Sequence, residues 1–118
     1  MTVVLEGMRV SVCRYEDLLP ELGVRALVGD AHVAVFRTFD GEVFAVDAVD
    51  PFSGASVLSR GVVGTHGGEP VVVSPMHKQR FELRTGRCVD NPSTRVRVFS
   101  ADVVDGRVVI GLGAATDE

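Results

Sequence analysis

The sequence predicts an all-β protein, and three observations lead to this prediction. Apolar residues make up 46% of the 118 residues and charged residues 24%, a balance typical of a packed chain rather than a disordered one. Several short runs alternate apolar and polar residues with period two, as strands with one buried face do. Gly, Asp, Asn and Pro separate these runs at intervals of roughly ten residues. A small sandwich or partly open barrel is therefore expected, in a single domain over residues 1–118.

The first half of the chain predicts a strand, a helical turn and a meander. Residues 8–13 alternate and form the first strand. Residues 14–22 place two acidic residues before a Leu pair, which favours one helical turn that Pro20 then ends. The Asp-Gly pair at 40–41 predicts a hairpin, because it supplies the positive φ angles of a tight turn. The strands around these turns are expected at residues 24–28, 32–37 and 43–46.

The second half predicts further short strands separated by turns. Four glycines between residues 61 and 68 are interpreted as turns, because no Lys-Ser or Lys-Thr follows to complete a phosphate-binding loop. The Asp-Gly pair at 105–106 predicts a second hairpin. Residues 113–118 are expected to be flexible. The strands of this half are expected near residues 62–63 and at residues 69–73, 81–83, 95–99 and 108–110.

Composition excludes several classes of protein. A net charge of -4 makes a nucleic-acid partner improbable, because nucleic acids are recruited by clustered positive charge. We expect no membrane segment, since no apolar run approaches the length of a span. Cys13 and Cys88 form no Cys-x-x-Cys pair, so we expect neither a zinc site nor a disulfide framework. Small thiols in a reducing compartment are the expected alternative, and with them a cytoplasmic location.

The chain shows no catalytic motif. A nucleophile elbow, a His-Glu-x-x-His pair and a dinucleotide fingerprint are all missing from the sequence. His32 stands at the start of an expected strand and His66 in a glycine-rich turn, and neither has a second metal-ligand residue at fixed spacing. We therefore expect both histidines to be surface residues, and we do not expect the chain to be catalytic alone.

Two loops are the most informative part of the sequence. They are headed by Asp50-Pro51-Phe52 and by Ser74-Pro75-Met76-His77. Their spacing resembles the Rieske ferredoxin pattern, in which Cys-x-His and Cys-x-x-His hold a two-iron cluster. Mapped onto that pattern, the ligand positions are Asp50, Phe52, Ser74 and His77, so only one of the four residues matches. The resemblance implies a Rieske-like fold, with a small lobe over about residues 47–89, that lacks the cluster ligands.

One family shares this departure from the pattern. The string Asp-Pro-Phe-Ser-Gly at 50–54 and the string Lys-Gln-Arg-Phe at 78–81 resemble the small subunit of assimilatory NAD(P)H-dependent nitrite reductase. That resemblance implies a non-catalytic subunit of a cytoplasmic complex that reduces nitrite to ammonium in nitrate assimilation. It further implies that FAD, siroheme, an iron-sulfur cluster and NADH are bound by the large subunit, and that this chain carries no cofactor.

The ends of the two loops are candidates for binding the partner. With the ligands gone, Phe52 and Met76 either turn inward and fill the space of the cluster, which we favour for Phe52, or stay outside. In the second case they form an apolar patch rimmed by Lys78, Arg80 and Asp50, a pattern typical of docking sites. The partner-binding candidates are therefore Phe52, Met76, Lys78 and Arg80.

Two other functions are open at this point. One is a Rieske-type ferredoxin that carries electrons on a cluster with atypical oxygen ligands. The other is an independent small-molecule or metal-binding β module that uses His77 and Asp50, with Ser74 as a weak third donor. Iron content discriminates the first alternative, and calorimetry with zinc, iron or nitrite discriminates the second.

Overall fold

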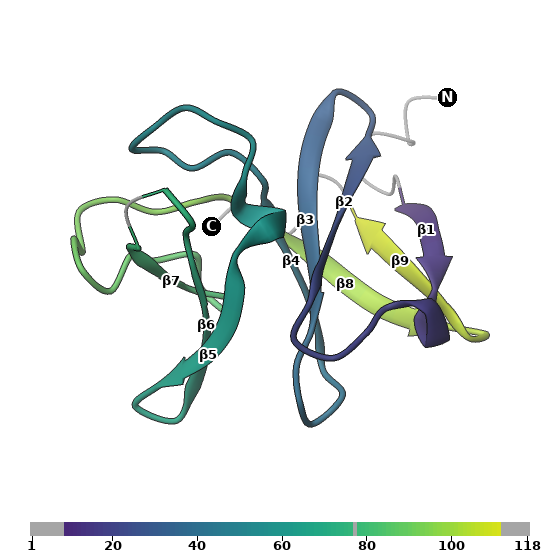
Figure 1. Cartoon of the computed structure of the whole chain (residues 1–118). Helices are drawn as coiled ribbons and strands as arrows, with labels where there is room; N and C mark the ends of the chain where they lie inside the picture. The colour runs from purple at the N-terminus through teal and green to yellow at the C-terminus, as the bar shows by residue number, and fades with distance from the viewer. Residues whose placement is uncertain (1–8, 77, 112–118) are drawn as a thin grey trace.

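The computed structural model describes residues 9–76 and 78–111, in which two antiparallel sheets lie side by side (Figure 1). The base sheet has the order β1-β9-β8-β4-β3-β2, and the small sheet has the order β5-β6-β7. The base sheet consists of β1 (Arg9–Arg14), β2 (Gly23–Val28), β3 (Ala31–Arg37), β4 (Val43–Asp47), β8 (Val98–Val104) and β9 (Arg107–Gly111). The small sheet consists of β5 (Val62–His66), β6 (Glu69–Val73) and β7 (Arg80–Glu82). Two 3-10 turns, η1 (Tyr15–Asp17) and η2 (Leu58–Arg60), lie in the connections.

Strand β3 separates two hydrophobic cores. Val33 and Val35 face the inside of the curled base sheet, where they pack in the cluster that contains Phe99. Ala34 and Phe36 belong to the other cluster, toward the small sheet. All four β3 residues are fully buried. A strand that is buried on both faces needs a continuous apolar run, which explains why this strand does not alternate.

The second core joins the two sheets. Figure 1 shows η2 between them, and Leu58 of η2 is buried in this core. Burial of each large apolar side chain contributes roughly 1.5–3 kcal/mol, so this cluster holds the small sheet against the base sheet. Its members are Ala34, Phe36, Val46, Ala48, Leu58, Val63, Val72, Phe81, Leu83, Cys88 and Val96.

The predicted all-β class, a larger sheet with a smaller lobe, is confirmed. The strand expected at residues 95–99 is partly wrong, because β8 begins only at Val98. The Val96 N–H donates to the Gly86 carbonyl at 2.8 Å, and the Val96 side chain is buried between the sheets, so the regular pairing with β4 does not extend back to Val96. Arg97 keeps one bond to β4, since its carbonyl accepts from the Asp47 N–H at 2.9 Å. The turn η2 was not predicted. The tail at residues 113–118 lies outside the described residues.

Both cysteines are free thiols. Cys13 is half-buried on β1, and Cys88 is fully buried in the core between the sheets. Burial raises the pKa of the Cys13 thiol, with a further contribution from Asp17, so this thiol is less reactive than an exposed one. In the part of the chain that the structure describes, no helix is long and apolar enough to cross a membrane.

Candidate functional site

The first loop, residues 50–54, is held closed by the residue that begins it. The Phe52 N–H donates to the Asp50 carboxylate at 2.8 Å, and the Gly54 N–H donates to the Asp50 carbonyl at 2.7 Å. The Asp50 N–H donates to the Ala55 carbonyl at 2.8 Å. An Asp side chain that accepts the N–H two residues later forms a turn of its own. The loop therefore has a defined shape without any metal.

The second loop begins at Ser74 and repeats these three hydrogen bonds. The Met76 N–H donates to the Ser74 hydroxyl at 3.2 Å, and the Lys78 N–H donates to the Ser74 carbonyl at 3.0 Å. The Ser74 N–H donates to the Gln79 carbonyl at 2.9 Å. The two loops thus have the same pattern of backbone hydrogen bonds. His77, the fourth predicted ligand position, lies outside the described residues.

A buried hydrogen bond joins the two loops. The Ser74 hydroxyl donates to the Asp50 carboxylate at 2.5 Å, and both residues have an exposed fraction of 0%. A hydrogen bond to a charged group is among the stronger ones in proteins. In one of the two alternatives Asp50 was expected at the rim of an exposed patch, and this expectation is wrong because its carboxylate turns inward to accept from both loops. The sequence brought the two residues into one site but did not predict that they bond to each other.

The side chains at these positions do not fit an iron-sulfur cluster. A Rieske cluster needs thiolate and imidazole donors. Phe52 has no donor atom, and the oxygens of Asp50 and Ser74 are hard donors already bound to each other. Over residues 9–76 and 78–111, no group of three or more His, Cys, Asp or Glu side chains is arranged to hold a metal ion.

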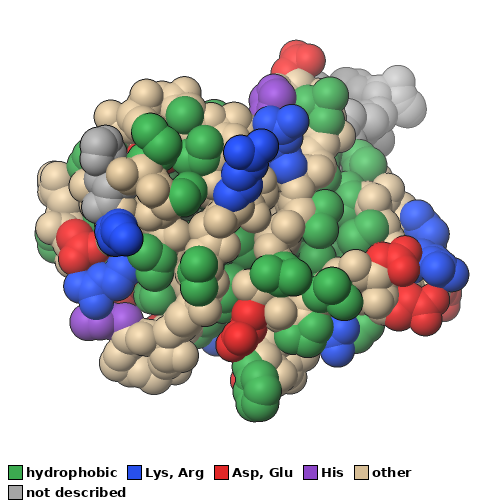
Figure 2. Space-filling model, viewed as in Figure 1, with side chains coloured by type: hydrophobic (Ala, Val, Ile, Leu, Met, Phe, Trp, Pro, Cys, Tyr) green, Lys and Arg blue, Asp and Glu red, His purple; other side chains and the backbone are tan. Residues whose placement is uncertain are grey.

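Phe52 and Met76 occupy equivalent positions at the ends of the two loops. The Phe52 ring lies 6.2 Å from the Phe81 ring, measured between centroids, and still has an exposed fraction of 37%. Met76 has an exposed fraction of 48%. Phe52 was expected either inside the loops or at the surface, and it combines the two. One side of its ring packs on Phe81 and the other side faces solvent. Figure 2 shows hydrophobic side chains gathered over this end of the molecule.

Lys78 has an unusual backbone conformation. Its φ is +63°, and the equivalent residue of the first loop is Gly54 with a φ of +77°. Glycine adopts this left-handed region without strain, whereas a residue with a Cβ pays about 1–2 kcal/mol. Such strain is concentrated at functional sites. Lys78 is also exposed, and it is the only lysine in the chain.

Arg80 is held by Asp90 rather than free at the surface. Its guanidinium donates to the Asp90 carboxylate at 2.7 Å, and its backbone N–H donates to the same carboxylate at 2.8 Å. These bonds lower the pKa of Asp90 and raise the pKa of Arg80. The sequence did not indicate Asp90, because only the return of the chain beside β7 brings it to Arg80. The guanidinium of Arg80 is therefore held in one position by Asp90.

The two other histidines lie at the surface, as predicted. His32 is exposed on β3, and His66 is exposed at the end of β5. The His66 ring nitrogen Nδ1 lies 3.3 Å from a guanidinium nitrogen of Arg80. Neither position gives a set of metal ligands, and both fit ordinary polar surface residues.

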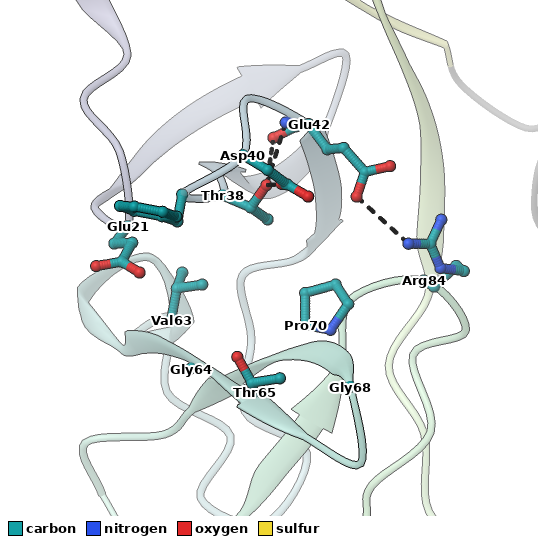
Figure 3. Close-up of a pocket in the computed structure, with 11 residues that line it drawn as sticks. Glu21, Thr38, Asp40, Glu42, Val63, Gly64, Thr65, Gly68, Pro70 and Arg84 are labelled. Atoms are coloured by element: carbon teal, nitrogen blue, oxygen red, sulfur yellow. Dashed lines mark hydrogen bonds and ion pairs between the residues drawn. The ribbon is translucent and has the colours of Figure 1, made fainter.

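A cleft of about 280 Å³ lies between the two sheets, at the turn between β3 and β4 (Figure 3). It was not predicted, because its carboxylates come from segments far apart in the sequence. Glu21 precedes β2, whereas Asp40 and Glu42 belong to the turn. Arg84 lies at one end, where it bonds Glu42 at 3.4 Å.

The sequence and the fold of this chain are both similar to those of known proteins. The model of the Rieske-like [2Fe-2S] domain matches residues 9–111. The small subunit of NADH nitrite reductase from Escherichia coli K12 is 47% identical over 98 residues, which are 82% of this chain and 91% of that protein. A crystal structure described as an NADH-dependent nitrite reductase small subunit, from Mycobacterium tuberculosis, superposes with a TM-score of 0.89 at 45% identity. It covers 92% of this chain and 97% of that one.

A third relative is a much longer protein. The large subunit of NAD(P)H nitrite reductase from Klebsiella oxytoca is 41% identical over 101 residues. These residues are 86% of this chain but only 10% of that protein. Nearly the whole of this fold therefore recurs as one segment of a large-subunit polypeptide.

Proposed function

This chain belongs to the family of Rieske-like [2Fe-2S] domains and, within it, to the nitrite reductase small subunits, and from this membership we propose that it is the non-catalytic small subunit of an NADH-dependent nitrite reductase. The complex reduces nitrite to ammonium in the cytoplasm during nitrate assimilation. FAD, siroheme, an iron-sulfur cluster and NADH bind to the large subunit. This chain supplies a binding surface and no cofactor.

The relative from Klebsiella oxytoca is the observation that carries this proposal. A segment similar to this chain is part of its large-subunit polypeptide, so the two units are joined there covalently. Where the units are separate chains, as the name of the similar small subunit from Escherichia coli indicates for that protein, a non-covalent contact has to replace the peptide link. A specific protein surface is therefore the feature that this chain has to provide.

The ends of the two loops are the surface that we assign to this contact. We define the docking tip as Phe52, Met76, Lys78 and Arg80. Phe52 and Met76 provide exposed apolar area, Lys78 belongs to the second loop, and Arg80 begins β7 directly after it. Apolar area accompanied by polar and charged residues is the usual composition of an interface. Because the Asp50–Ser74 bond fixes both loops in advance, little conformational entropy is lost on binding.

Substitution of Met76 by Asp is expected to weaken binding to the large subunit about ten- to a hundredfold, because burial of such a side chain contributes roughly 1.5–3 kcal/mol. The measurement is the dissociation constant for the purified large subunit. Val103→Asp is the matched control, since Val103 has a similar exposed fraction (46%) but lies in the base sheet, near the end of β8. Equal effects of the two substitutions would place the interface elsewhere.

Lys78 gives an independent readout in the unmodified complex. As the only lysine, it is the single side-chain amine that an acetylating reagent modifies. We expect the large subunit to slow acetylation of Lys78 strongly, while an exposed amine of the large subunit remains reactive. Acetylation of Lys78 at the same rate in the free chain and in the complex contradicts docking through the tip.

A further inference from the structure

The cleft between the two sheets is lined mainly by acidic side chains among its charged residues. Glu21, Asp40 and Glu42 contribute carboxylates to its lining, and Arg84 contributes the one lining cation among the described residues. Arg84 is already engaged, because its guanidinium bonds Glu69 at 3.0 Å as well as Glu42. No ion pair joins Glu21 or Asp40 to a basic residue in the described part of the chain. The cleft therefore favours a cationic group.

Strands β5 and β6 form one wall of the cleft, and β5 is an edge strand of the small sheet. Strand β5 pairs with β6 on one side only, and among the described residues its other edge has no backbone partner. Figure 3 shows Val63, Thr65 and Pro70 on this side of the cleft, opposite Thr38, Asp40 and Glu42. Gly64 lies at the centre of β5, and a Cβ placed on it meets no atom within 4 Å. An edge of this kind pairs readily with an extended chain.

The size of the cleft limits what enters it. Its volume of about 280 Å³ lies at the small end of the roughly 300–1,000 Å³ of ligand pockets, and it has room for one long side chain. Phe39 stands at the cleft with an exposed fraction of 83% and offers apolar contact to the stem of a long side chain. Lys and Arg combine such a stem with a positive charge.

From these features we propose that the cleft binds an extended basic segment of the large subunit. The segment pairs along the free edge of β5 and inserts a Lys or Arg side chain toward Glu21, Asp40 and Glu42. This inference rests on the proposed function for the identity of the partner. It adds a second contact, of opposite charge to the docking tip, which fixes the orientation of the small subunit on the large one.

Two substitutions test the cleft, with the purified large subunit as the probe. Glu21→Lys reverses a charge of the lining, and Thr65→Lys places a competing cation on the face of β5 that lines the cleft. Each is expected to raise the dissociation constant about tenfold or more. Asp30→Lys is the matched control, because this exposed acidic residue lies in the turn between β2 and β3, at the other end of that ribbon from Glu21. We expect a change below about twofold for Asp30→Lys, as usual for a charge outside the contact.

The outcomes separate this inference from the proposed function. Unchanged melting temperatures establish that the variants are folded. If Met76→Asp weakens the complex but Glu21→Lys and Thr65→Lys bind like the wild type, the cleft inference is overturned and the docking tip stands. If the unmodified chain does not bind the large subunit at all, both are overturned. Weakening by both cleft variants, with the control unaffected, supports the inference.

Discussion

Substitution of Ser74 by alanine is expected to lower the free energy of unfolding by about 2–3 kcal/mol, because it leaves the buried Asp50 carboxylate without its donor. The Met76 N–H loses its acceptor in the same step. Urea denaturation followed by circular dichroism measures this change. Ser93→Ala is the matched control, since Ser93 also donates to a side-chain oxygen, that of Asn91 at 2.9 Å, but at the surface. The control is expected to change stability by less than about 0.5 kcal/mol.

A double-mutant cycle shows whether the stability comes from the bond itself. In the Asp50→Ala, Ser74→Ala double variant the hydroxyl and the carboxylate are both gone, so neither is left buried without its partner. The double variant should therefore lose less stability than the sum of the single losses, by about 1 kcal/mol or more. Strict additivity would show that the two residues act separately and that the loops are joined by something else.

Substitution of Gly86 by alanine is expected to cost about 4 kcal/mol, which combines the strain of a positive φ with a steric clash. A Cβ on Gly86 would lie 2.1 Å from the carbonyl oxygen of Val96. Gly106→Ala isolates the first contribution. Gly106 has a φ of +77°, close to the +82° of Gly86, and its Cβ would meet no atom within 4 Å.

The difference between these two glycine variants measures how tightly the small sheet is held. We expect Gly106→Ala to cost only about 1–2 kcal/mol, the usual penalty for this conformation. Thermal and urea unfolding give both values. Similar losses in the two variants would contradict close packing of residues 84–87 beneath the segment that leads into β8.

Much of the fold could be predicted because its signals are local. Period-two alternation identified β1, and the Asp-Gly pair at 40–41 identified a hairpin. The start of β8 could not be predicted, since the burial of Val96 depends on the Gly86 carbonyl ten residues earlier. Likewise, Gly86 reads in the sequence as an ordinary turn residue. Only the structure shows the carbonyl above it that excludes every side chain.

The sequence predicted which residues lie in the two loops, but it did not predict the contacts that these residues make. The loop sequences headed by Asp50-Pro51 and Ser74-Pro75 predicted two turns, and the structure places Asp50, Phe52 and Ser74 in these two turns. Their contacts could not be predicted, since an inward and an outward Asp50 have the same sequence. The cleft was missed for a similar reason, because Glu21 and Arg84 come to line one cleft only through the packing of two sheets.

The measurement that tests the central claim most directly is the iron and acid-labile sulfide content of the chain purified under anaerobic conditions. Because oxygen atoms and a phenyl ring replace the required donors, we expect colourless protein with essentially no iron. A brown protein with about two irons and two sulfides per chain would show that this fold still holds a cluster. It would then be an electron carrier, and the Asp50–Ser74 bond would not be what joins the two loops.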